Sequence, residues 1–199
     1  MLKKLFTNDR FFAAAAGISV IASIAALVLF LLAGDFASEP GGLYLVGYVL
    51  LAVCVSGLYF SYQKHDKNVM KGLMGVLLAT LLLTDCYSLE AVTYHGYAAP
   101  YLELFLIALD LVLMINHFIL NSDHGSRPGN ILINQVAASI LALTNLAELG
   151  IMVGLSADII GDLRLALGSG AAMLAYLFAF VSIVCVESRL DLYKSMRKQ

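Results

Sequence analysis

Six long apolar stretches constrain this chain more than any other feature of its sequence. A membrane-spanning helix needs about 20 consecutive apolar residues, because the hydrocarbon core is about 30 Å thick and each residue advances the helix by about 1.5 Å. All six stretches reach that length, and only short polar segments separate them. The sequence therefore predicts an all-α integral membrane protein, a bundle of six transmembrane helices in one domain. The predicted spans cover residues 11–33, 43–62, 72–93, 101–120, 131–155 and 165–186.

The composition agrees with this assignment and excludes other classes. Of the 199 residues, 61% are hydrophobic and 13% are charged, whereas a soluble domain is about 45–50% apolar and about 25% charged. A net charge of -2 provides no field that would attract a polyanion, so nucleic-acid binding is not expected. The cysteines lie in apolar stretches without metal-ligand spacing, and we expect all three to be small buried side chains. They are Cys54, Cys86 and Cys185.

The distribution of Lys and Arg predicts the orientation of the helices. All of these residues except Arg164 flank the predicted spans on one side. Cytoplasmic flanks retain positive charge, so we expect a multi-pass protein of the plasma (cytoplasmic) membrane with both termini in the cytoplasm. The apolar run of the first span, about 23 residues, exceeds the roughly 7–15 of a cleaved signal peptide. We therefore expect the first span to be a retained signal anchor.

Small residues recur at helical spacing in the first and last spans. Such faces let two helices approach closely in lipid. They predict internal packing within the bundle or docking onto another subunit, either in a homo-oligomer or with other membrane proteins. The residues are Ala15, Ser19, Ala22, Ser23 and Ala26 in the first span and Gly168, Ala171, Ala172, Ala175 and Ala179 in the sixth.

Ionisable residues at bilayer depth carry the strongest functional signal. Each costs at least about 2.5–3.5 kcal/mol at the centre of a lone helix, so it tends to face the interior of a bundle. Spans one, two and six have none in their interiors. Spans three to five contain Asp85, Glu90, Glu103, Asp110, His117 and Glu148.

The spacing of these residues predicts a shared site. Glu103, Asp110 and His117 recur every seven residues in the fourth span, which is nearly two helical turns, so they share one stripe. The helical rise places Asp85, Asn145 and Glu148 at similar heights in the outer half of the bundle, above Asp110. We therefore predict that the binding core consists of Asp85, Asp110, Asn145 and Glu148.

Other polar residues extend this predicted site toward both surfaces. Glu90 and Glu103 are expected at its outer mouth, and His117 on the cytoplasmic side, where it would relay protons. Tyr87 lies near the outer end of the third span and is assigned to the ligand site. There a tyrosine contributes to an aromatic cage for an ammonium group or to an interfacial belt. The pattern predicts an acidic cavity that opens outward.

The carboxyl groups have no Lys or Arg at the same depth to neutralise them. Several close carboxylates cannot all ionise in a low dielectric. They share protons, bind a metal cation or hold a positively charged ligand, or they serve only as protonated acids that cross-link helices. The sequence identifies neither a metal nor a cofactor.

The predicted function is binding or transport of a cation or cationic small molecule among spans three to five, with or without coupling to protons. One alternative is a non-catalytic subunit or assembly factor of a larger membrane complex, favoured by the short loops. A second is an intramembrane metal-dependent enzyme. The enzyme is less favoured, because one histidine two turns from Asp110 fits a compact metal site poorly and no HExxH or GxSxG motif occurs.

Overall fold

Six long helices build the structure, a computed structural model that describes residues 5–33, 39–64, 66–95, 100–121, 128–159 and 163–196. Within these ranges the chain is all-α, as predicted, and every predicted span falls inside one helix. The helices are α2 (Asp9–Ala33), α3 (Glu39–Gln63), α4 (Lys67–His95), α5 (Pro100–Asn121), α6 (Pro128–Ile159) and α7 (Leu163–Met196).

Polar residues cap the starts of two helices. Asn8 precedes α2, and its Oδ1 accepts a hydrogen bond of 2.9 Å from the backbone N–H of Arg10. Asp66 precedes α4, and its Oδ1 accepts hydrogen bonds of 3.2 Å from the N–H groups of Asn68 and Val69. These side chains satisfy backbone donors that have no partner within the first helical turn.

The three prolines of the chain all lie in first turns: Pro40 in α3, Pro100 in α5 and Pro128 in α6. Proline fits there because the N–H that it lacks would have no partner within the helix. The interiors of the helices therefore contain no proline and continue without a break across the bundle.

Four helices contain stretches that are long and apolar enough to cross a membrane, by length and composition of the described residues. These stretches are Asp9–Leu32, Leu45–Gln63, Asn68–Cys86 and Leu167–Ser188. Shorter apolar stretches, Leu104–Phe118 and Leu132–Ala147, lie in α5 and α6. Large apolar side chains cover the outside of the bundle, for example Ile21 at 70% exposure and Leu143 at 65%. Such a surface suits lipid and not water, as expected of a membrane protein.

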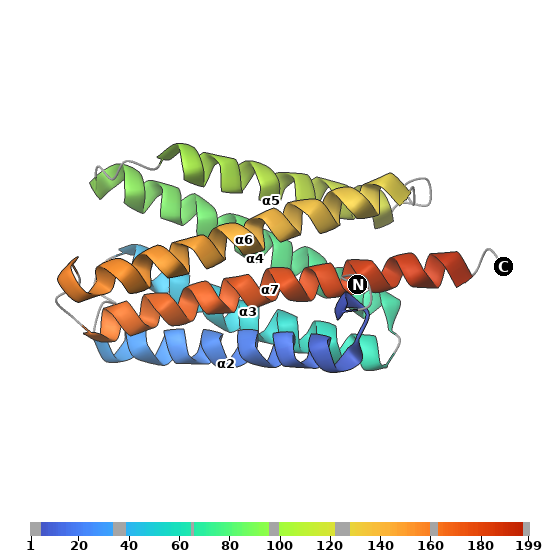
Figure 1. The fold of residues 1–199 in the computed structure, drawn as a ribbon, viewed down its shortest axis with the longest axis horizontal. Helices are drawn as coiled ribbons and strands as arrows, with labels where there is room; N and C mark the ends of the chain where they lie inside the picture. The colour runs from blue at the N-terminus through green and yellow to red at the C-terminus, as the bar shows by residue number, and fades with distance from the viewer. Residues whose placement is uncertain are drawn as a thin grey trace.

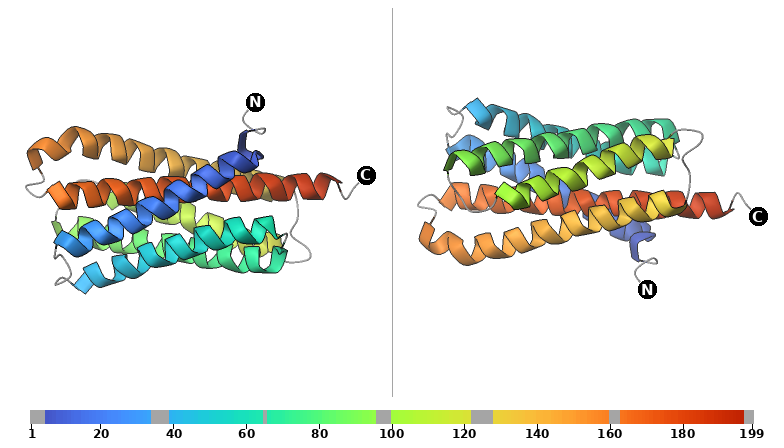
Figure 2. Two further views of the ribbon diagram at one scale, coloured as in Figure 1. Left: turned by 90° about the horizontal axis from the view of Figure 1, so that it is seen from below. Right: turned by 90° about the horizontal axis from the view of Figure 1, so that it is seen from above.

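The helices form a closed ring in chain order. Each helix packs against the next one along the chain, and α7 closes the ring by packing against α2. Figures 1 and 2 show the result, an elongated bundle in which α2 begins and α7 ends at the same end. The most extensive contact joins α2 to α7, whereas α5 packs against α4 and α6 at the opposite edge.

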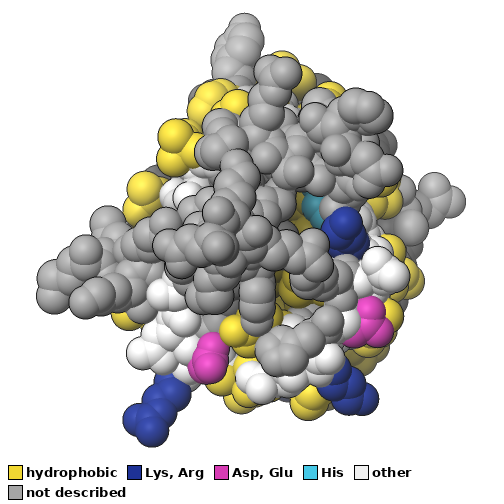
Figure 3. All heavy atoms as spheres, turned by 90° about the vertical axis from the view of Figure 1, so that its right-hand side faces the viewer, with side chains coloured by type: hydrophobic (Ala, Val, Ile, Leu, Met, Phe, Trp, Pro, Cys, Tyr) yellow, Lys and Arg dark blue, Asp and Glu magenta, His cyan; other side chains and the backbone are white. Residues whose placement is uncertain are grey.

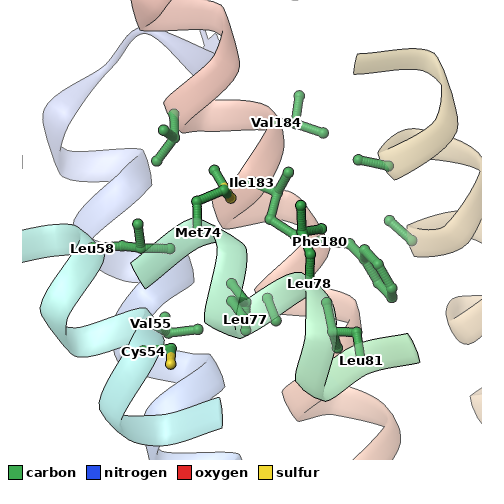
Figure 4. Close-up of a cluster of buried hydrophobic side chains, with 14 of the residues drawn as sticks. Cys54, Val55, Leu58, Met74, Leu77, Leu78, Leu81, Phe180, Ile183 and Val184 are labelled. Atoms are coloured by element: carbon green, nitrogen blue, oxygen red, sulfur yellow. The ribbon is translucent and has the colours of Figure 1, made fainter. Parts of the chain in front are cut away.

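An apolar core fills the centre of the ring between α3, α4 and α7. Figure 4 shows leucine and methionine side chains of α4 pointing toward α3 and α7. Burial of each such side chain stabilises a water-soluble core by about 1.5–3 kcal/mol, but in lipid the gain comes mainly from close packing. The labelled core residues are Cys54, Val55 and Leu58 of α3, Met74, Leu77, Leu78 and Leu81 of α4, and Phe180, Ile183 and Val184 of α7.

The small-residue faces of α2 and α7 pack against each other. Ser19 of α2 donates a hydrogen bond of 2.8 Å from its Oγ to the backbone carbonyl of Ala175 on α7. A Cβ added to Gly168 would lie 3.3 Å from a ring carbon of Phe30, so the backbones already approach closely there. These faces are therefore covered within the chain, and a partner subunit would have to use the remaining faces of α2 and α7.

Candidate functional site

Two carboxyl groups from neighbouring helices meet inside the bundle. Asp85 lies on α4 and Asp110 on α5, and their carboxyl groups are close enough to interact. Asp110 is 0% exposed, and no donor among the described residues reaches either of its carboxyl oxygens. Two ionised carboxyl groups offer only acceptors. Their contact therefore requires a proton or another positive charge between them.

The apolar pattern of each helix brings the two carboxyl groups together. On α4, Asp85 follows Leu81 by four residues, so both lie on the helix face that turns toward the core. On α5, Asp110 lies between Leu106 and Leu113, which are both buried. Because α4 and α5 pack side by side, the acidic residues meet where the two buried stripes face each other.

The seven-residue repeat of α5 places Asp110 and His117 on one buried face, as the sequence predicts. His117 is 6% exposed, and its ring Nε2 lies 3.1 Å from the backbone carbonyl of Lys71 on α4. A carbonyl only accepts hydrogen bonds, so Nε2 carries a proton and donates it. This bond fixes the orientation of the imidazole ring against α4.

A chain of polar side chains crosses three helices near His117. Asn116 of α5 donates a hydrogen bond of 2.9 Å from its Nδ2 to Oδ1 of Asn134 on α6. Asn134 in turn donates one of 3.1 Å from its Nδ2 to Oε1 of Glu187 on α7. All three residues are buried, at 7%, 1% and 2% exposure respectively. The chain therefore links α5, α6 and α7 through side chains that lie inside the bundle.

Leucines separate this polar chain from the pair of aspartates. Leu81 on α4, Leu113 on α5 and Leu141 on α6 are at most 1% exposed and belong to the same buried cluster. Leu113 lies three residues from Asp110 and three from Asn116, which is about 4.5 Å along the helix in each direction. The bundle thus has two polar levels with an apolar layer between them.

The other residues predicted for the site have different surroundings. Asn145 is buried, but its Nδ2 donates a hydrogen bond of 2.9 Å to the carbonyl of Leu141 on its own helix. The side chains of four predicted residues lie outside the described part of the structure, although their backbones belong to α4, α5 and α6. These are Tyr87, Glu90, Glu103 and Glu148.

Glu187 is a buried ionisable residue that the sequence analysis missed. The sixth predicted span ends at residue 186, whereas α7 continues to Met196. A usable signal was present, because Glu187 continues the four-residue spacing of Ala175, Ala179 and Ile183, which are all buried. Extending that stripe by one turn would have placed Glu187 inside the bundle.

The burial of the three cysteines agrees only in part with the prediction. Cys54 and Cys185 are buried, as predicted, but Cys86 is exposed. The prediction for Cys86 was wrong because its neighbour Asp85 takes the inward position on α4, and adjacent residues on a helix point about 100° apart. Cys86 therefore turns away from the core.

Among the described residues, no group of three or more His, Cys, Asp or Glu side chains is close enough to hold a metal ion. No family model, no curated protein sequence and no solved structure matches this chain. Function is therefore inferred from the polar residues inside the bundle.

Proposed function

We propose that this chain is a six-span protein of the cytoplasmic membrane that carries a small cation. The cation competes with a proton for the space between Asp85 and Asp110. Both termini lie in the cytoplasm, as the distribution of Lys and Arg favours. In this orientation the aspartates lie in the outer half of the membrane and Glu187 lies toward the cytoplasm.

The observation that carries this proposal is the environment of Asp110. Its two oxygens are buried without a donor among the described residues, and the carboxyl group of Asp85 is close enough to interact with them. An isolated pair of acids at bilayer depth is costly, and such residues mark ion pathways and proton relays in membrane proteins. A proton on one carboxyl group forms a hydrogen bond to an oxygen of the other. A cation that replaces this proton interacts with both carboxylates. Exchange of the two is the chemistry that this arrangement supports best.

The proposal is tested with the purified chain in liposomes that enclose a pH-sensitive dye and an acidic buffer. Na⁺, K⁺, Ca²⁺ and choline are added outside, one at a time. We expect one of these cations to make the lumen more alkaline, and we expect Asp110→Asn to reduce the initial rate at least about tenfold. Asp66→Asn is the matched control, because Asp66 is an exposed helix cap and asparagine caps as well as aspartate.

A lumen pH that responds to none of the four cations, or equally in wild type and Asp110→Asn, would contradict the carrier function. The same assay distinguishes the carrier from the alternative, a non-catalytic subunit of a larger membrane complex. In that case the aspartates only cross-link α4 and α5, and Asp110→Asn leaves any ion flux unchanged.

The six-span topology has its own test. A reporter active only in the cytoplasm and one active only outside are fused in turn to the C-terminus. The proposed topology predicts signal from the cytoplasmic reporter alone. The opposite result would reverse the bundle and place Glu187 toward the outside.

A further inference from the structure

A buried carboxyl group outside the Asp85–Asp110 pair lies at the end of the bundle where α7 ends. Glu187 is 2% exposed and accepts a hydrogen bond from Asn134, which accepts one from Asn116. The Asp85–Asp110 pair does not include this group, and the leucine layer separates the two. Glu187 is therefore part of a buried hydrogen-bonded chain that joins three helices, and not a charge at the surface that marks the end of a span.

The hydrogen bonds of this chain all run in one direction. The amide of Asn116 donates to Asn134, and the amide of Asn134 donates to Glu187. With the amides in this direction, Glu187 accepts the last hydrogen bond, as an ionised carboxylate does. A protonated Glu187 has an O–H that donates, so rotation of both amides by about 180° reverses the direction of these two hydrogen bonds. The two hydrogen bonds of the chain can therefore run in either direction, and the two arrangements differ by one proton.

Other charged groups surround this end of the bundle, which Figure 3 views directly. The α6 side chains that form hydrogen bonds with this part of α7 are Asn134 and Gln135, and both are neutral. His117 of α5 is buried and donates to a backbone carbonyl, and Lys71 of α4 is partly buried. The remaining described titratable or charged side chains from α2, α3 and the start of α4 are Asp9, Arg10, Tyr59, Tyr62, Lys64 and Asp66.

Exposure distinguishes Glu187 from most of these groups. Asp9, Arg10, Lys64 and Asp66 are exposed, so water and salt screen their charges. Tyr62 donates a hydrogen bond of 3.3 Å to Asp9 and is thereby engaged at the rim. Glu187 is thus the buried carboxyl group among the described residues at this end.

We propose that Glu187 is a second proton-binding site, which exchanges its proton with the cytoplasm on the far side of the leucine layer from Asp85 and Asp110. The step is a simple transfer: hydronium protonates a carboxylate oxygen of Glu187 and leaves water, and the reverse step returns the proton. The role of this proton in transport rests on the proposed function. Proton binding by Glu187 does not rest on it.

The proposal is tested by infrared difference spectroscopy of the full chain in liposomes, stepped between about pH 5 and about pH 9. Wild type is expected to show a pH-dependent carboxylic acid C=O band that shifts when the carboxyl groups of glutamate are isotope-labelled, together with a change in the asparagine amide bands. Glu187→Gln removes both signals, because glutamine keeps the hydrogen bond from Asn134 but binds no proton. Gln135→Leu is the control; it removes a bond of 3.3 Å to Ser188 between the same two helices and keeps both signals.

A second variant covers the case in which Glu187→Gln does not fold. Glu187→Asp retains a carboxyl group at this position. We expect isotope-labelling of the aspartate carboxyl groups to shift the pH-dependent band of this variant, whereas labelling of the glutamate carboxyl groups shifts the corresponding band of wild type. A wild-type spectrum without a pH-dependent glutamate band overturns the proposal.

Failure of this proposal and failure of the proposed function give different results. Cation exchange that depends on Asp110 without a Glu187 band overturns only the second proton site. A Glu187 band without cation exchange overturns only the carrier function. If both hold, Glu187→Gln is expected to slow the cation-driven rise of the lumen pH at least about tenfold while cation binding to Asp110 persists.

Discussion

The two sides of this bundle differ in how their helices are held together. On one side α2 and α7 meet along small residues, and their closest polar contact joins Ser19 to a backbone carbonyl. On the other side α5 packs less extensively against α4 and α6, and its buried stripe includes Asp110, Asn116 and His117. The α2–α7 side is built from small, closely packed residues. The α5 side contains buried polar side chains, which are expensive to place inside a membrane.

The contrast separates close packing from buried polar groups. In lipid, helices gain stability from close packing of small residues, so the α2–α7 contact supplies a rigid support. A charged or protonated group contributes little to such packing and is expensive at this depth. We therefore propose that the buried polar residues of α4, α5 and α6, together with Glu187 of α7, serve an ion or proton pathway and not only stability.

Overpacking the α2–α7 contact should give the largest loss of stability. Ala175 is 0% exposed against α2, and Ala175→Leu is expected to lower the free energy of unfolding by about 3 kcal/mol, because the larger side chain forces the helices apart. Thermal unfolding can be followed by labelling of the buried thiols of Cys54 and Cys185 in a Cys86→Ala background.

The matched control is Ala14→Leu, which adds the same atoms on the exposed face of α2. It should change the midpoint of unfolding little. Equal effects of the two substitutions would show that the α2–α7 contact is not the rigid side of the bundle.

Breaking the polar chain should have an intermediate effect. Asn134→Leu removes two hydrogen bonds and leaves buried groups of Asn116 and Glu187 without this partner. We expect a loss of about 2 kcal/mol in the free energy of unfolding. Gln135→Leu, at a partly buried position, should cost less than half as much in the same thiol-labelling assay. The reverse order would contradict a chain that joins three helices.

Removing the hydroxyl of Ser19, which bridges α2 and α7, should have the smallest effect. Ser19→Ala is expected to cost about 0.6 kcal/mol, the mean value for hydrogen bonds between membrane helices. Ser23→Ala, whose hydroxyl bonds to the carbonyl of Ser19 on its own helix, should cost less. A loss for Ser19→Ala larger than that for Ala175→Leu would mean that polar bonding, and not packing, holds this side together.

Much of this contrast is predictable from the sequence, because it depends on periodicity. The apolar stretches predict all six helices, and the seven-residue spacing puts Asp110 and His117 on one buried face. Side-chain conformation is not encoded in this way. The helical rise predicts that Asn145 lies at the height of Asp85. In the structure its amide donates to Leu141 of its own helix, a choice of rotamer that spacing does not determine.

The end of α7 was harder to predict for a different reason. A charged residue after an apolar run usually marks the end of a span, so the prediction stopped at residue 186. In the structure the helix continues, and Asn134 on α6 supplies the amide that lets Glu187 remain buried. That partner lies 53 residues away in the sequence, and no local pattern connects the two.

The state of the Asp85–Asp110 pair tests the central claim most directly. Infrared spectra of the wild-type chain at neutral pH are recorded with and without Na⁺, K⁺, Ca²⁺ and choline in turn. We predict a carboxylic acid band that shifts when the carboxyl groups of aspartate are isotope-labelled. This band is absent from Asp110→Asn, unchanged in Asp66→Asn, and reduced when one of the cations replaces the shared proton. A wild-type spectrum without that band, or with a band that none of these cations reduces, would contradict a site in which a proton and a cation compete.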